Sequence, residues 1–150
     1  MTTEVSDPFN LNRFVEAQAS DYEQALAELR AGRKRTHWIW HVLPQLRGLG
    51  FSQMSNRYGI GSIAEAESYL VHPILGPRLQ TCVAALNSLV GLSAVEVLGD
   101  VDAAKFCSCL TLFAQIAGEE SLFSEALNKY FQGQPDRKTL SLLSAGTGQP

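Results

Sequence analysis

His37 and His41 are the residues of this chain whose types and spacing most directly suggest chemistry. If the segment between them is helical, positions i and i+4 share one face, so both imidazoles could hold a metal ion or transfer a proton. A zinc site needs a third and usually a fourth ligand, and the remaining histidine of the sequence is His72. We therefore expect no metal and no cofactor here, and packing or ligand contact is the alternative. His37 is the best candidate for a catalytic acid or base.

The segment around these histidines carries only basic charge. Between Leu29 and Ala64 there is no Asp or Glu, and the basic residues are Arg30, Arg33, Lys34, Arg35, Arg47 and Arg57. The chain has a net charge of −3 and this window carries +6, so the remainder carries −9. Such asymmetry predicts an anionic partner. The alternative is that the basic side chains lie over acidic helices.

Neutral hydrogen-bond donors occur in the same window, in a glycine-rich setting. The candidate ligand contacts are Gln45, Ser52, Arg57 and Tyr58. Donors beside an arginine suit an oxyanion or a sugar, although a polar surface loop has the same composition. The run from Gly48 to Ser52 has neither the Lys-Ser/Thr ending of a Walker loop nor the spacing of a Rossmann fingerprint. Gly48 and Gly50 would then let an anion approach the backbone, or they simply form turns.

Trp38 and Trp40 lie two positions apart, which places them about 200° apart on a helix. One indole is therefore expected in the core, while the other is free to form the wall of a site. We include Trp38 among the candidate ligand contacts. The alternative is that both tryptophans are core residues.

Three candidates lie outside the window. Arg78 follows a proline at a helix start, where a cation is unfavourable unless an acid or a bound anion meets it. Lys105 and Ser108 lie near one face of a later apolar helix together with Thr111. Such a polar stripe is either solvated or lines a site. A surface pair between Lys105 and Asp102 is the alternative interpretation.

The elements that must position these residues are helices. Apolar residues recur at helical spacing through most of the chain, and Ser-x-x-Glu capping boxes begin at Ser20, Ser62 and Ser93. The sequence predicts an all-α protein, a single compact domain over 1–150 with seven or eight helices, several of them short. A long Gly-rich connecting segment is expected over 33–60, with frayed tails at 1–6 and 146–150.

Composition supports a globular protein in a reducing compartment. The 150 residues are 45% hydrophobic, and no apolar run approaches the roughly 20 residues of a membrane span. The N-terminal residues lack the features of a signal peptide, so we expect a cytoplasmic location. The odd number of cysteines, Cys82, Cys107 and Cys109, and their apolar helical surroundings favour buried free thiols over disulfides.

Three motifs resemble the domain-of-unknown-function 1810 family of small bacterial proteins. They are HWIWHVLPQLRGLGFSQMSNRYGI, EAESYLVHPILGPRL and DAAKFCSCLTLF. The resemblance runs from about Asp7 to Leu143 and implies a mainly helical fold, with no established activity. His41 departs from the family pattern, which has an aromatic residue there, usually Phe. Cys107 and Cys109 also depart from it, since the family more often has Arg and Ser around Ser108.

Three functional hypotheses follow. The first is a domain that binds a small anionic molecule, such as a nucleotide or sugar phosphate, in a cleft lined by 33–60. The second is a hydrolase- or transferase-type enzyme acting on such a ligand, with His37 as acid or base. The third is an adaptor that uses the basic patch Arg30–Arg35 against an acidic partner. Nucleic acid is a poor fit because the acidic remainder of the chain would repel its backbone.

Overall fold

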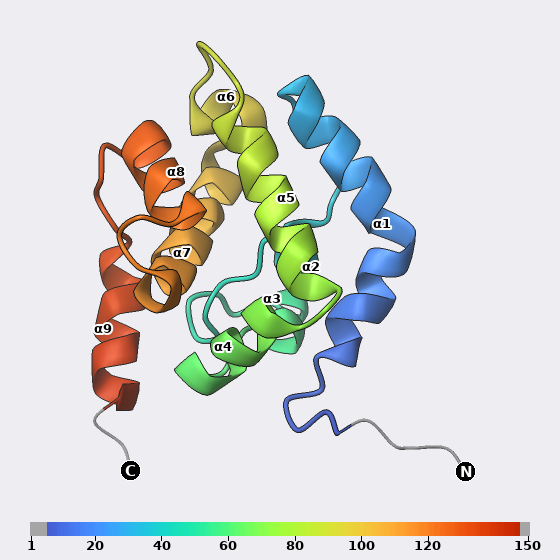
Figure 1. Ribbon diagram of the computed structural model, residues 1–150, viewed down its shortest axis with the longest axis vertical. Helices are drawn as coiled ribbons and strands as arrows, with labels where there is room; N and C mark the ends of the chain where they lie inside the picture. Colours follow the sequence, from blue (N-terminus) through green and yellow to red (C-terminus); the bar gives the residue numbers. More distant parts are fainter. Residues whose placement is uncertain (1–5, 148–150) are drawn as a thin grey trace.

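The structure is a computed structural model that describes residues 6–147, and these residues form nine α-helices (Figure 1). The helices are α1 (Asn12–Ala31), α2 (Ile39–Val42), α3 (Gln53–Tyr58), α4 (Ile63–Val71), α5 (Leu75–Asn87), α6 (Ala94–Leu98), α7 (Asp100–Ala117), α8 (Leu122–Phe131) and α9 (Arg137–Thr147). The all-α prediction is confirmed. The helix count exceeds the predicted seven or eight because the segment 33–60 contains α2 and α3.

The first helix is continuous where the sequence predicted two. A capping box was expected to start a new helix at Ser20, but α1 runs unbroken from Asn12 to Ala31. No glycine or proline interrupts this stretch, so backbone hydrogen bonding continues through the serine. Asp7 caps the start instead, since its carboxylate accepts the backbone N–H groups of Leu11 and Asn12 at 2.7 and 2.9 Å.

Other predicted helix ends are confirmed. The hydroxyl of Ser62 accepts the N–H of Glu65, and Ser93 forms a complete capping box with Glu96. Gly32 ends α1 with φ 76°, the left-handed conformation that a glycine adopts without strain. These ends fix where the chain leaves α1 and enters the segment that was expected to carry the site.

A chain of aromatic rings joins four helices through the core. Phe14 of α1 packs edge-on against Tyr69 of α4 at 5.1 Å between ring centroids. Tyr69 contacts Phe113 of α7 at 5.6 Å, and Phe113 contacts Phe123 of α8 at the same distance. All four side chains are buried. α7 therefore lies at the centre of the bundle, and it packs against α4, α6, α8 and α9.

The segment 33–60 is folded back on itself rather than extended. An isolated parallel bridge joins Leu46 to Ile60: the N–H of Ile60 donates to the carbonyl of Gln45 at 2.9 Å, and Arg47 N–H donates to Ile60 at 2.7 Å. This close pairing requires Gly59, because a Cβ there would lie 2.7 Å from the Cα of Arg47. The bridge brings together the two ends of the segment 46–60, which contains both the loop before α3 and α3 itself. No β-strand is formed in the described part of the chain.

The chain ends fall partly within the described residues. α9 extends to Thr147, two residues into the segment predicted as a C-terminal tail, while residues 1–5 and 148–150 of the predicted tails lie outside the description. Within residues 6–147, no helix is both long enough and apolar enough to cross a membrane.

Candidate functional site

A groove of about 500 Å³ lies between the segment 45–55, one face of α7 and the start of α9. Five of the predicted ligand contacts line it: Gln45, Gly50, Ser52, Lys105 and Ser108. They come from segments more than fifty residues apart in sequence, which the fold brings to one surface. The groove is the candidate binding site of this protein.

One wall is a face of α7. Val101, Ala104, Lys105 and Ser108 follow the i, i+3, i+4, i+7 pattern of a single helix face. The ammonium group of Lys105 lies 5.4 Å from the centre of the Trp40 ring, a cation–π contact. Lys105 makes no ion pair with any residue that the structure describes. Its positive charge is therefore available to a ligand in the groove.

The predicted pair between Lys105 and Asp102 is wrong. Asp102 binds Lys34 instead, with 2.8 Å between the ammonium nitrogen and the carboxylate oxygen. Lys34 lies between α1 and α2, and its backbone N–H donates to the carbonyl of Val97 at 2.7 Å. The turn after α1 is thereby held against α6 and the start of α7, and Asp102 is occupied outside the groove.

The opposite wall is the loop before α3. The hydroxyl of Ser52 accepts the N–H of Ser55 and lies 3.0 Å from the Ser55 hydroxyl. Gly50 packs directly over this pair, since a Cβ at position 50 would meet the Ser55 hydroxyl oxygen at 2.5 Å. The side-chain amide of Gln45 makes no hydrogen bond with residues 6–147, so its donors remain free to meet a ligand.

The third wall is the start of α9, which the sequence interpretation missed. Asp136 and Lys138 line the groove there. The backbone N–H of Asp136 donates to the buried Thr111 hydroxyl at 2.8 Å, which fixes α9 against α7. One carboxylate oxygen of Asp136 accepts both the N–H and the hydroxyl of Thr139, at 2.9 and 2.6 Å, as a helix cap.

A sequence signal for Lys138 did exist. Lys138 lies in the first turn of α9, where a cation opposes the helix dipole. Arg78, which the sequence analysis proposed as a ligand contact, has the same feature of a cation at the start of a helix. The groove therefore carries two lysines against one carboxylate, and that carboxylate is already engaged in capping.

Trp38 and Tyr58 do not reach the groove. Trp38 is 1% exposed, and its indole N–H donates to the carboxylate of Glu28 at 2.9 Å. Tyr58 is buried against Phe14 and His41. Neither side chain lines the groove, because both are buried in the core. Trp40 is the partly exposed tryptophan, and its indole N–H is buried without a partner among the described residues.

The predicted arginine contacts also lie elsewhere. The guanidinium of Arg78 stacks over the Tyr22 ring at 4.7 Å and contacts Gln18 at 3.4 Å, so it joins α5 to α1. Arg57 is exposed and lies over its neighbour Tyr58, at 5.5 Å from the ring centre. Gly48 has φ 101° and borders Leu142 rather than the groove. None of these three residues lines the groove.

The two histidines do not share a helix face. His37 is exposed and precedes α2, which begins at Ile39, so it is outside the helix that the spacing argument assumed. His41 is 4% exposed and is bonded to Asp21, with 2.7 Å between its Nε2 and a carboxylate oxygen. In the described part of the chain, no three His, Cys, Asp or Glu side chains cluster in a way that could hold a metal. His37 does not line the groove.

The cations of the acid-free window do not converge on the groove. Arg47 is bonded to the carbonyls of Asn56 and Gly59, at 3.3 and 3.0 Å, and Lys34 is paired with Asp102. The exposed cations Arg30, Arg33 and Arg35 lie at the end of α1 and in the turn after it. The window therefore supplies the groove with neutral donors, while its positive charge comes from α7 and α9.

Comparison with known proteins identifies the family of this chain. The family model described as "Protein of unknown function (DUF1810)" matches residues 8–143. The chain belongs to this family. Among solved structures, it is similar to the conserved hypothetical protein Rv1873 from Mycobacterium tuberculosis, with 51% identity and a TM-score of 0.89. That match covers 92% of this chain and 99% of the other. No protein of the curated set matches the chain.

None of the positions at which this member was expected to depart from the DUF1810 pattern lines the groove. His41 is buried and its ring packs against the ring of Tyr58, with 5.3 Å between the ring centroids. Cys109 is buried and Cys107 half-buried, on either side of Ser108. Burial, with a smaller contribution from the negative charge of Asp136, raises the pKa of Cys107 to about 11, so this thiol is protonated at neutral pH.

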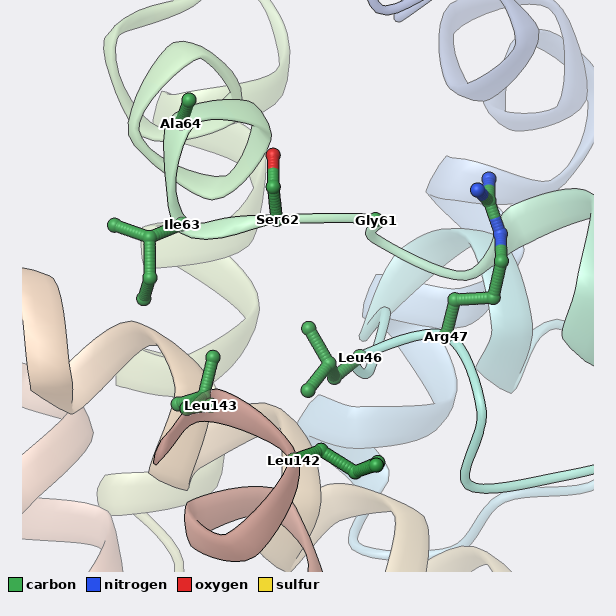
Figure 2. A pocket seen from close by; sticks show the side chains of 8 residues that line it. All are labelled: Leu46, Arg47, Gly61, Ser62, Ile63, Ala64, Leu142 and Leu143. Atoms are coloured by element: carbon green, nitrogen blue, oxygen red, sulfur yellow. The ribbon is translucent and has the colours of Figure 1, made fainter. Parts of the chain in front are cut away.

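A second hollow of the DUF1810 chain lies beside the Leu46–Ile60 bridge and holds about 360 Å³. Figure 2 shows Leu46 and Leu143 on facing sides of this hollow, with the Arg47 guanidinium turned away from both. That guanidinium donates to the Gly59 carbonyl at 3.0 Å. Arg47 is the one charged residue that lines this hollow, and its guanidinium already donates to backbone carbonyls, so this hollow offers less to an anion than the groove does.

Proposed function

We propose that this protein binds a small anionic molecule in the groove between segment 45–55, α7 and the start of α9. The observation that carries the proposal is Lys105, a cation that lines the groove and makes no ion pair with the described residues. Lys138 adds a second positive charge, and the one acidic residue of the lining, Asp136, already caps α9.

Hydrogen bonding in the groove supports the same conclusion. Gln45 presents free amide donors from the loop, and Ser52 and Ser55 lie beside it. Charge-assisted bonds from lysine together with neutral donors are the usual means of holding an oxyanion. The hydroxyl of Ser108 donates to the carbonyl of Ala104 at 3.1 Å, so Ser108 shapes the wall without donating to a ligand.

The dimensions of the groove support a metabolite-sized ligand. A volume of about 500 Å³ falls within the range typical of small-molecule sites, which is roughly 300–1,000 Å³. The contact of Lys105 with the Trp40 ring holds the ammonium group in place before a ligand arrives. Such pre-organisation lowers the entropy that binding must otherwise lose.

Titration calorimetry with ribose 5-phosphate and with pyrophosphate tests the proposal. We expect Lys105→Met to weaken binding of these anions about tenfold or more, which corresponds to roughly 1.4 kcal/mol. Lys138→Met should weaken it less, because that side chain is exposed. Lys129→Met on α8 is the matched control, since Lys129 is exposed and lies outside the groove. Equal binding by wild type and Lys105→Met would contradict the proposal.

A second candidate function is an adaptor that binds an acidic partner through the patch Arg30–Arg35. It is supported by the exposure of Arg30, Arg33 and Arg35, which form no ion pair within the described residues. Reversing the charge of Arg33 and Arg35 to Glu should abolish binding to poly-L-glutamate without affecting phosphate binding in the groove. The enzyme alternative has less support, because His37, its assigned acid or base, lies outside the groove.

A further inference from the structure

Two strongly exposed apolar side chains line the same groove as the lysines. Phe51 is 89% exposed and Val101 is 68% exposed. They come from different walls, Phe51 from the loop before α3 and Val101 from α7. Ordinary surface leucines and valines are scattered singly, whereas these two side chains line the same groove. Their position indicates that the groove has an apolar part as well as a cationic one.

The loop that carries Phe51 is fixed on both sides of the aromatic residue. Gly50 packs over the Ser55 hydroxyl, and Ser52 caps α3 through the N–H of Ser55. The backbone at position 51 therefore has a defined direction even though its side chain contacts little. An exposed phenylalanine on a fixed loop offers a flat face on which a planar ring can stack.

The apolar and cationic parts of the groove are adjacent. Val101 and Lys105 are about one helical turn apart on the same face of α7, about 6 Å along the helix axis. A ligand that covers Val101 and reaches Lys105 therefore combines an apolar group with an anion, separated by a short linker. Nucleoside phosphates have this arrangement, with a flat base, a sugar and then a phosphate. Sugar phosphates and inorganic anions have no group for the apolar part.

We infer that the anion bound in this groove carries a planar heteroaromatic ring, as a nucleoside phosphate does. The ring stacks on Phe51 and covers Val101, and the phosphate lies between Lys105 and Lys138. This inference rests on the proposed function, from which it takes the groove and its anion. It adds the class of ligand and assigns Phe51 as the residue that selects it.

The experiment compares ribose 5-phosphate with AMP, GMP, CMP and UMP by titration calorimetry. We expect at least one nucleotide to bind wild type about tenfold more tightly than ribose 5-phosphate, since stacking on an aromatic side chain supplies such a factor. Phe51→Ala should remove this preference and leave the affinity for ribose 5-phosphate unchanged. Because Phe51 is exposed, the substitution is not expected to disturb folding. Val90→Ala is the matched control, since Val90 is 88% exposed and lies outside the groove.

The outcomes separate the two proposals. If ribose 5-phosphate binds in a manner that depends on Lys105 and no nucleotide binds more tightly, the ring inference is wrong and the proposed function stands. The same holds if Phe51→Ala weakens nucleotide and ribose 5-phosphate equally or weakens neither. If none of these phosphates binds, both proposals are wrong.

Discussion

The indole nitrogen of Trp38 lies 2.9 Å from a carboxylate oxygen of Glu28, ten residues earlier in the chain. The same carboxylate accepts the backbone N–H groups of Arg35 and Thr36, at 2.8 and 3.0 Å, and the Thr36 hydroxyl at 2.7 Å. Glu28 thus organises the basic turn after α1 from beneath. The backbone of this basic turn is therefore held by an internal carboxylate, while the side chains of Arg33 and Arg35 remain exposed.

Because hydrogen bonds stabilise the ionised Glu28 carboxylate, we expect the protein to lose stability in acid. Burial alone would raise the pKa of Glu28, but the hydrogen bonds from Arg35, Gln24, Thr36 and Trp38 lower it from 4.5 to about 2. Because the folded-state pKa lies below the unfolded value, the stabilisation is complete above about pH 4.5 and is lost as the pH falls toward 2. Glu28→Gln should lower the free energy of unfolding at pH 7 by on the order of 3 kcal/mol. Urea unfolding at pH 7 and at pH 3 should show the gap between wild type and variant narrowing; a constant gap would contradict this.

The Lys34–Asp102 pair predicts a measurable coupling energy. Both side chains are mostly buried, with exposures of 7% and 18%, so solvent screens them less than a surface pair. A double-mutant cycle of Lys34→Met and Asp102→Asn should give a coupling of about 1 kcal/mol in thermal or urea unfolding. The cycle of Lys105→Met with Asp102→Asn is the control and should be additive within about 0.5 kcal/mol. A larger coupling energy for Lys105 with Asp102 than for Lys34 with Asp102 would contradict this prediction and would support the surface pair that the sequence suggested.

We expect a side chain at position 59 to clash with the bridge between Leu46 and Ile60. An alanine Cβ at this position would lie 2.7 Å from the backbone of Arg47, which cannot move without breaking the bridge. Gly59→Ala should destabilise the fold by about 2 kcal/mol. Gly91→Ala is the comparison: its Cβ would enter open space, and its φ of 75° alone should cost about 1 kcal/mol. Equal losses in thermal unfolding would show that the bridge does not restrain this loop.

Because His41 is buried, we expect the free energy of unfolding to decrease as the pH falls below neutrality. Burial lowers the pKa of His41 below 6.5, and the hydrogen bond to Asp21 opposes this shift only in part. The unfolded chain therefore takes up a proton before the folded protein does, and stability falls as the pH drops below about 6.5. His41→Phe, which restores the aromatic residue expected in the family, should reduce the loss between pH 7 and pH 5. His37→Gln, at an exposed position, should leave that loss unchanged.

Local rules predicted much of the fold. The caps at Ser62 and Ser93 depend on neighbours within a few residues, and both helix starts are confirmed. The Ser20 prediction failed because a capping box alone does not stop a helix that lacks a breaker. The location of the site was harder to predict, since Lys34 and Arg47 have partners far along the chain. Lys105 and Gln45 were predicted as ligand contacts from their residue types. Lys138 lies beside them only because tertiary packing places the start of α9 at the groove.

Two walls of the groove, α7 and the start of α9, are joined by the hydrogen bond from the backbone N–H of Asp136 to the hydroxyl of Thr111. A molecule bound between Gln45, Lys105 and Lys138 would contact both the middle of the chain and its last helix, and would therefore hold α9 in place. When the protein is saturated with this ligand, the amide hydrogens of α9 would exchange more slowly with solvent, because the helix could detach locally only after the ligand had been released.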